Sequence, residues 1–166
     1  HNDQMFEAFM NYGSINLSFR GYQDAERAFR RAVELRPQDY DAHIGLGVTL
    51  RGLQRYPDAQ AEYEAAQRID QNRPDAFFNL GALYQYYMGG TIADLERSIG
   101  FFQQYLQKSQ NNPRFANNRA AVERRVQLIQ TTINFQRSNA AAAQQKPGDA
   151  SDAAAASDMA TDVSGR

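Results

Sequence analysis

Residues 22–36 alternate apolar and charged side chains with the period of an amphipathic helix. The apolar positions are Ala25, Ala28, Phe29, Ala32 and Val33. Steps of three and four residues place all five on one face, so the stretch is expected to bury that face and expose its charged residues. Pro37 ends the helix, because proline cannot continue a helix interior.

The hydrophobic pattern repeats every 34 residues. Gly13, Gly47 and Gly81 are separated by this interval. The same interval relates Tyr22 to Tyr56, Ala25 to Ala59, Phe29 to Tyr63, and Ala32 to Ala66. A fixed period of this length indicates stacked units of two helices each. Three units are expected at residues 6–39, 40–73 and 74–112, the third with an insertion near residues 88–92.

The recurring glycines predict close packing of the two helices within a unit. A helical glycine costs about 1 kcal/mol relative to alanine, so its recurrence at one register favours a steric reason. We expect Ala25 to face Gly13 and Ala59 to face Gly47, with the aromatic residues filling the remaining space.

These offsets resemble the tetratricopeptide repeat, whose signature places a bulky residue, Leu-Gly, an aromatic, Ala, an aromatic, Ala and Pro at set positions. The first unit supplies Phe9, Tyr12, Gly13, Tyr22, Ala25, Phe29, Ala32 and Pro37. The third unit regains this register after about five extra residues, with a helix start near Asp94 and with Ser98, Phe102 and Tyr105 at the packing positions. The resemblance implies an all-α, right-handed α-solenoid of about three helix-turn-helix hairpins over residues 4–112.

Two further segments follow the repeats. Residues 113–139 are expected to form a long C-terminal capping helix, since an array needs a terminal element with one polar face. Its apolar positions are Phe115, Val122, Val126, Ile129 and Ile133. Half of a further repeat is the rival interpretation. Residues 140–166 are rich in Ala, Ser and Asp and predict a disordered tail.

Composition excludes several classes of function. The net charge is −1 and the Arg residues are scattered among acids, which does not favour nucleic-acid binding. The absence of cysteine removes disulfides, thiolate metal sites and a cysteine nucleophile. His43 takes a packing position, and Gly89-Gly90 lacks the Lys of a phosphate-binding loop. We therefore expect no enzyme, no metal site and no cofactor, and no apolar run reaches the ~20 residues that span a bilayer.

The resemblance also implies a concave groove, formed by the first helix of each unit, in which a partner peptide lies. The groove positions in this chain are Met10, Ser14, Leu17, Asp41, Ile44, Val48, Arg51, Asp75, Phe78, Asn79, Gln85 and Tyr86. Chaperone-binding members clamp a terminal carboxylate with Lys, Arg and Asn at such positions, and that clamp is absent here. An apolar strip rimmed by Asp41, Asp75 and Arg51 is predicted instead, which suits an amphipathic helix or an extended apolar peptide. The alternative is a strip covered within the molecule, for example by the capping helix.

The expected function is a non-catalytic scaffold that binds another protein within a multiprotein assembly. The alternative is a self-associating adaptor, a homodimer through repeat end faces that include Tyr86 and Tyr87. Residues 77–106 also resemble, more weakly, repeat proteins of bacterial gliding-motility complexes. Together with the excess of Arg over Lys, this favours the bacterial periplasm or outer membrane over the cytoplasm. The chain begins at His1, which is compatible with removal of a signal or lipid-anchored segment.

Overall fold

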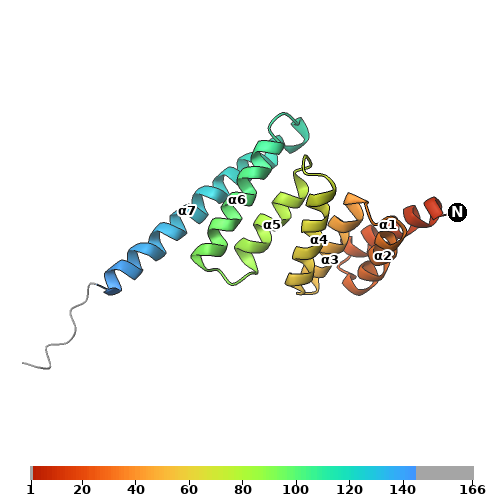
Figure 1. The fold of residues 1–166 in the computed structure, drawn as a ribbon, viewed down its shortest axis with the longest axis horizontal. Coiled ribbons are helices and arrows are strands. Elements are labelled where there is room, and N and C mark those ends of the chain that lie inside the picture. Colours follow the sequence, from red (N-terminus) through yellow and green to blue (C-terminus); the bar gives the residue numbers. More distant parts are fainter. Residues whose placement is uncertain (1, 145–166) are drawn as a thin grey trace, which may run out of the picture. The chain divides into compact units, whose positions relative to one another are not determined.

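The computed structural model describes residues 2–144, which form helical hairpins stacked in chain order. The first hairpin consists of α1 (Asn2–Ser18) and α2 (Tyr22–Leu35), the second of α3 (Tyr40–Gly52) and α4 (Tyr56–Ile69), and the third of α5 (Asp75–Tyr86) and α6 (Ile92–Lys108). Consecutive helices from α1 to α6 lie side by side (Figure 1). No strand occurs within the described residues. The all-α, right-handed solenoid predicted from the 34-residue period is confirmed.

Each hairpin closes with a glycine beneath an aromatic ring. A Cβ atom on Gly47 would lie 2.5 Å from Cε1 of Tyr63, and one on Gly81 would lie 2.8 Å from Cδ1 of Phe102. Real Cβ atoms do not approach carbon so closely, so only glycine allows this contact. The three atoms nearest to a Cβ on each of these glycines belong to an aromatic ring, so the rings, rather than Ala25 and Ala59, make the closest contacts.

The third hairpin contains the expected insertion. Gly89 and Gly90 have φ angles of 111° and 70°, in the left-handed region that favours glycine. The helix after them begins at Ile92, two residues before the position expected, because Thr91 caps it. The Thr91 hydroxyl accepts the Asp94 N–H at 3.1 Å, and the Asp94 carboxylate accepts the Thr91 N–H at 3.3 Å.

The packing positions predicted after the insertion are confirmed. Ser98 and Phe102 are completely buried, and Tyr105 is almost completely buried. The Ser98 hydroxyl donates to the Gly81 carbonyl at 2.7 Å, so a polar group in this interface has a partner across the hairpin. The five extra residues therefore lengthen the turn and leave the contact between α5 and α6 in register.

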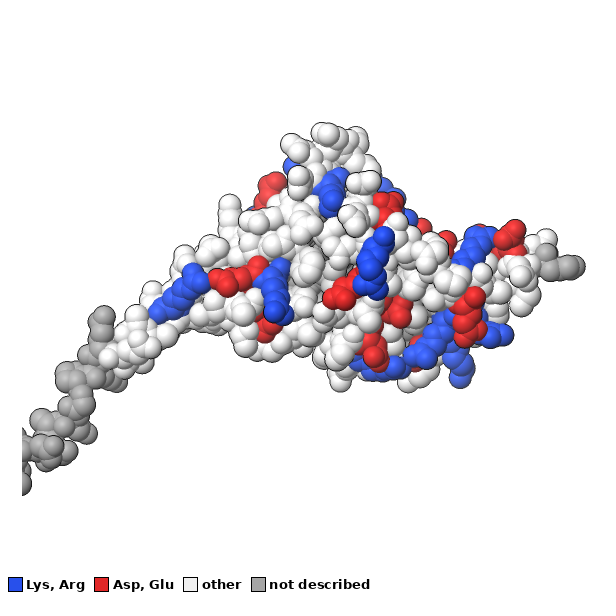
Figure 2. Space-filling model, viewed as in Figure 1, with Lys and Arg blue, Asp and Glu red and all other residues white. Residues whose placement is uncertain are grey.

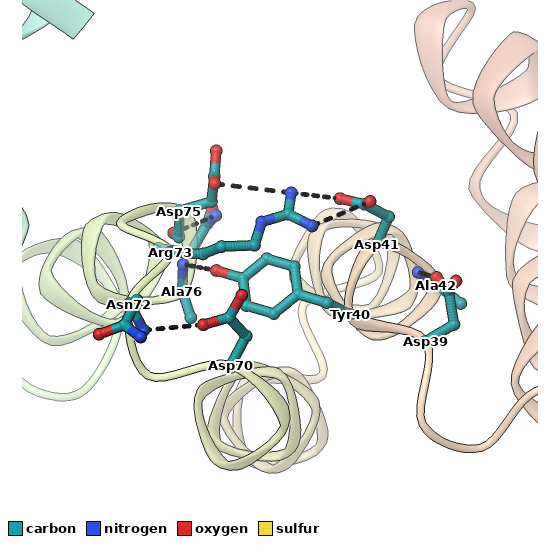
Figure 3. A network of polar contacts seen from close by, with 10 residues as sticks. Asp39, Tyr40, Asp41, Ala42, Asp70, Asn72, Arg73, Asp75 and Ala76 are labelled. Carbon is teal, nitrogen blue, oxygen red and sulfur yellow. Dashed lines mark hydrogen bonds and ion pairs between the residues drawn. The ribbon is translucent and has the colours of Figure 1, made fainter. Parts of the chain in front are cut away.

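An arginine after the second hairpin ties that hairpin to the third (Figure 3). The Arg73 guanidinium lies 3.9 Å from the Tyr40 ring centroid and donates to both Asp41 oxygens, at 3.0 and 2.6 Å. Asp75 lies 3.8 Å from the same group. The Tyr40 hydroxyl accepts the Ala76 N–H at 2.8 Å, and burial raises the pKa of Tyr40 to about 12. Cation–π stacking and paired hydrogen bonds thus fix α3 against the start of α5.

A similar tie follows the first hairpin. The Arg36 guanidinium lies 3.9 Å from the Phe6 ring centroid, 2.7 Å from Asp3 and 3.6 Å from Glu7. Arg36 and Arg73 are 37 residues apart rather than 34. The ring and one acid of each tie follow the 34-residue period, Phe6 to Tyr40 and Glu7 to Asp41, whereas the arginine departs from it.

The last helix packs on the third hairpin. A short 3₁₀ turn, η1 (Pro113–Phe115), precedes α7 (Ala116–Gln144). Val122, Ile129 and Ile133 of α7 are buried in one cluster with Phe77 and Phe102. These contacts are those of a cap on the end of the array, and they equally fit the first helix of a further repeat.

The chain divides into two units, residues 1–133 and residues 134–166. The first contains the three hairpins and most of α7. The described part of the second, residues 134–144, is helical, so the helix extends beyond the boundary expected at residue 139. The remainder of the predicted disordered tail, residues 145–166, lies outside the described residues.

Candidate protein-binding groove

The residues predicted for the groove all lie on the first helices of the three hairpins. Met10, Ser14 and Leu17 belong to α1, the four residues from Asp41 to Arg51 belong to α3, and the five from Asp75 to Tyr86 belong to α5. These helices contact one another, α1 with α3 and α3 with α5. They therefore form one continuous surface, but its parts differ in how far other side chains cover them.

The open part of this surface is a hollow of about 350 Å³ beside the C-terminal ends of α1 and α3. We call it the inner hollow. It is lined by Leu17, Ser18, Arg20, Tyr22, Val48, Arg51, Gly52 and Tyr87. Three of the predicted groove residues, Leu17, Val48 and Arg51, are thus brought together.

Two guanidinium groups line the inner hollow without an acidic partner. Neither Arg20 nor Arg51 forms an ion pair with any residue that the structure describes. Arg51 donates one long hydrogen bond, 3.4 Å, to the Asn79 side-chain oxygen. The inner hollow therefore combines apolar side chains with two cations whose charge is not neutralised locally, which is a setting for a carboxylate.

The backbone places Arg20 at this hollow. Its φ angle is 60°, and the Gly21 N–H donates back to the Asn16 carbonyl at 2.8 Å, which closes the end of α1. Gln54, 34 residues later, has a φ angle of 62° at the same point of the next hairpin. Non-glycine residues adopt this conformation rarely. The turn between α3 and α4 therefore has its left-handed residue at Gln54.

Tyrosine rings form the edge of the hollow. The Tyr87 ring stacks on Tyr56 with centroids 4.8 Å apart. Tyr22 lies so close to Gly52 that any side chain at Gly52 would overlap its ring. The tyrosines connect consecutive hairpins here, so the edge of the hollow is held by packing between repeats.

The predicted acidic rim is already neutralised. Asp41 accepts both hydrogen bonds from Arg73, and Asp75 lies 3.8 Å from the same guanidinium. The rim therefore acts in the tie between hairpins shown in Figure 3. Of the three charged residues expected on the rim, only Arg51 lacks an ion-pair partner within the described chain.

In the third hairpin, side chains of α6 and α7 lie against Phe78 of the strip. The Phe78 ring lies 6.0 Å from Phe102 and 5.4 Å from Tyr105, both on α6. The Arg125 guanidinium of α7 lies 5.8 Å from the Phe78 ring and 5.6 Å from the Tyr86 ring. The capping helix therefore contributes Arg125 to this end of the strip, where Phe78 is half-buried and Tyr86 remains 58% exposed.

The other predicted groove residues have mixed surroundings. Met10 and Ile44 are half-buried against the core, and the Ser14 hydroxyl donates to the Met10 carbonyl at 2.7 Å. Asn79 is buried and donates to the Asp75 carbonyl at 3.0 Å. The Gln85 side-chain oxygen is buried with no hydrogen-bond partner among the described residues. None of these side chains faces the inner hollow.

Sequence reasoning missed Arg20, Tyr22, Gly52 and Tyr87 as site residues. The position of Arg20 follows from its left-handed φ angle, and the presence of an arginine does not predict that conformation. Arg51, which was predicted, shows in the sequence that it lacks an ion-pair partner on its own helix, because no acidic residue lies three or four positions away. The helical arginines Arg27, Arg30 and Arg31 all have one and pair with it.

The described residues contain no set of His, Asp or Glu side chains arranged to hold a metal ion. Within that part of the chain, no helix is both long and apolar enough to cross a bilayer. Lys and Arg side chains are interspersed with Asp and Glu over the face drawn in Figure 2. This surface pattern differs from the basic stripe of a nucleic-acid-binding protein.

Residues 13–76 match the tetratricopeptide repeat family. Over these residues the chain carries tetratricopeptide repeats. The match begins at Gly13 within α1 and ends at Ala76, at the start of α5 and before the insertion. No curated protein sequence matches the chain.

Solved tetratricopeptide structures share the fold at low sequence identity. The type III secretion chaperone SycD of Yersinia enterocolitica, in complex with a peptide of the translocator YopD, is 17% identical with a TM-score of 0.69, over 76% of this chain and 92% of that one. PcrH of Pseudomonas aeruginosa, in complex with the chaperone-binding region of PopD, is 18% identical with a TM-score of 0.71, over 78% and 94%. The TPR2B domain of yeast Sti1, in complex with pHsp70, is 14% identical with a TM-score of 0.65, over 80% and 98%.

Proposed function

We propose that the chain is a non-catalytic scaffold that binds a segment of another protein on the inner side of its repeats. The observation that carries the proposal is the inner hollow, where Leu17 and Val48 lie beside the unpaired Arg20 and Arg51. The three solved proteins described above all hold a protein segment on the same fold. That likeness supports the class of partner.

The hollow defines the chemistry of the partner segment. An apolar side chain suits Leu17 and Val48, and an Asp or Glu beside it pairs with Arg20 or Arg51. A charge-assisted hydrogen bond to guanidinium is about twice as strong as a neutral one, so the acidic residue supplies orientation as well as affinity. The partner is therefore an amphipathic or extended segment with an acidic residue next to a bulky apolar one.

A peptide selection tests this proposal. Random peptides displayed on phage are selected against the immobilised full chain, and the affinity of enriched peptides is measured by titration calorimetry. The expected result is enrichment of an apolar residue flanked by Asp or Glu. Arg51→Glu should then weaken binding at least about tenfold, since truncating or reversing a charge that pairs on binding costs 1.4 kcal/mol or more.

The matched control is Arg27→Glu. Arg27 has an exposed side chain on α2, away from the inner hollow, and carries the same charge. Equal affinity of the wild type, Arg51→Glu and Arg27→Glu for the selected peptides would contradict the proposal. Circular dichroism of the three proteins checks that the helices are intact.

We also propose that the assembly belongs to the bacterial envelope. The support is compositional, namely the excess of Arg over Lys and the Ala-rich C-terminal segment. Fractionation of the source cells with an antibody to the chain tests the location. Recovery in the periplasmic or outer-membrane fraction is expected, and recovery only in the cytoplasm would contradict this placement.

A further inference from the structure

The outer face of α1 carries an apolar stripe that other parts of the described chain leave exposed. Met5 is 46% exposed, Tyr12 53%, Ile15 57% and Phe19, one residue past the helix end, 83%. With Ala8 they occur at steps of three and four, the a and d positions of a heptad repeat. We call these five residues the α1 seam.

The three middle positions of the same register are buried in the other two hairpins. Residues 34 positions after Ala8, Tyr12 and Ile15 are Ala42, Leu46 and Thr49, whose exposures are 0%, 4% and 0%. In the third hairpin they are Ala76, Leu80 and Leu83, all 0% exposed. α3 and α5 use this face to stack on the preceding helices α2 and α4. The seam is therefore a stacking face with larger side chains and no helix upon it.

The charges of α1 lie away from the seam. Its two acidic residues, Asp3 and Glu7, both face Arg36. The positions that flank the seam are Gln4, Phe9, Asn11, Asn16 and Ser18, and none is charged. A second α1 can thus approach without the like-charge repulsion that flanking residues impose in mismatched helix pairs.

The side-chain sizes fit an antiparallel pair. A two-fold axis between Gly13 and Ser14 sets Ala8 of one copy opposite Phe19 of the other, and Tyr12 opposite Ile15. The smallest residue of the seam then meets one of the largest, as close packing requires. A two-fold interface is isologous, so each contact occurs twice.

We propose that α1 is a homodimerisation helix, which packs antiparallel on α1 of a second copy through the α1 seam. This surface is separate from the inner hollow and does not depend on the function proposed for it. It also differs from the face that contains Tyr86 and Tyr87, because those rings contact Arg125 and Tyr56 within the chain.

Light scattering after size exclusion tests the dimer. The full chain is run from about 1 to 100 μM, the range in which a moderate dimer forms, and twice the chain mass of 18.7 kDa is expected at the upper end. Phe19→Glu should raise the dimer dissociation constant at least about tenfold with unchanged circular dichroism, because the most exposed apolar side chain of the seam is replaced by a charge. Leu128→Glu, at an exposed apolar residue of α7, is the matched control and should leave the mass unchanged.

Crosslinking tests the orientation, since the chain has no cysteine of its own. A mixture of the Ala8→Cys and Phe19→Cys variants should form a disulfide-linked dimer, while either variant alone should not. Crosslinking of either variant alone would overturn the antiparallel arrangement. A monomer at every concentration would overturn the dimer and leave the seam to a helix of another protein. A dimer unaffected by Phe19→Glu would overturn the surface.

Discussion

Two hollows of similar volume lie on opposite faces of α3. They differ in whether their arginines form ion pairs with other described residues of the chain. The inner hollow, of about 350 Å³, takes Val48, Arg51 and Gly52 from this helix. A second, the outer hollow, of about 370 Å³, takes Leu46 and Leu50. Its other lining residues are Arg30, Val33, Glu34, Arg55, Asp58, Ala61 and Glu62.

The outer hollow has its ionic partners within the chain. Arg55 lies 2.7 Å from Glu26 and 2.6 Å from Asp58, and Arg30 lies 2.6 Å from Glu26. The cations of the inner hollow have no such partners among the described residues. A ligand that enters the outer hollow must break existing pairs, whereas one that enters the inner hollow gains new ones. Volume alone would not distinguish the two.

The largest expected effect is a loss of stability, and it differs between a buried residue on one face of α3 and a half-buried residue on the other. Leu50 is 2% exposed at the outer hollow, and Leu50→Ala should lower the free energy of unfolding by about 2–5 kcal/mol, as cavity-forming substitutions do. Val48 is only half-buried at the inner hollow, so Val48→Ala should lower it by about 1 kcal/mol. Urea unfolding of both variants measures the difference. Equal losses would show that Val48 is core rather than binding surface.

The next effect concerns the wall of the inner hollow. Gly52→Ala drives a methyl group into the Tyr22 ring and should destabilise the chain by about 1–3 kcal/mol. Gly100 of α6 is the control, because a Cβ atom there meets nothing within 4 Å. Gly100→Ala should therefore stabilise by about 0.5–1 kcal/mol through helix propensity. Thermal unfolding of both variants measures these changes. Unchanged stability of Gly52→Ala would mean that the Tyr22 ring moves freely.

The third expected effect is an increase in stability. Tyr63 is completely buried, and its hydroxyl has no hydrogen-bond partner among the described residues. Burial raises the pKa of Tyr63 to about 12. The first hairpin has Phe29 at the equivalent position. Tyr63→Phe removes an unsatisfied polar group and should stabilise by about 1 kcal/mol, as judged by denaturant unfolding. A loss of stability would show that the hydroxyl has a partner.

The smallest effect depends on pH and concerns His43, the partner of Glu62 at the outer hollow. His43 Nδ1 lies 2.6 Å from the Glu62 carboxylate, and Nε2 lies 2.9 Å from the Pro37 carbonyl. Both acceptors favour the imidazolium form, and the hydrogen bond with Glu62 is the main cause that raises the pKa of His43 above 6.5.

The sign of this dependence follows from the raised pKa of His43. The stabilisation from protonated His43 is complete below the pKa that His43 has in the unfolded chain, near 6.5. It is lost as pH rises through the higher pKa that His43 has in the folded chain. The wild type should therefore lose more thermal stability than His43→Gln between about pH 6 and pH 9. Identical pH profiles for the two proteins would refute the role of His43.

The sequence predicted the repeats because their contacts follow the 34-residue period. Gly47 under Tyr63 and Gly81 under Phe102 are such contacts, and five extra residues account for the difference in spacing. The ties made by Arg36 and Arg73 escaped prediction because they are 37 residues apart and stack on rings from the preceding hairpin. Periodicity therefore recovers the packing of glycines under aromatic rings more readily than the polar contacts of the arginines that follow a hairpin.

The candidate site was predicted only in part, for the same reason. Leu17, Val48 and Arg51 were found from their positions on the first helices. Phe78 also lies on a first helix, 34 residues after Ile44, yet the rings of α6 and Arg125 of α7 lie around it. Whether a groove position stays open depends on what packs against it, and α7 lies outside the repeat pattern.

Site-specific photo-crosslinking in the source cells tests the central claim most directly. A photoreactive residue replaces Ser18, exposed at the inner hollow, or Ala61, exposed at the outer hollow. We expect a discrete crosslinked partner from position 18, reduced when Arg51→Glu is also present, and none from position 61. The same products from both positions, or products from position 61 alone, would contradict a partner-binding role for the inner hollow.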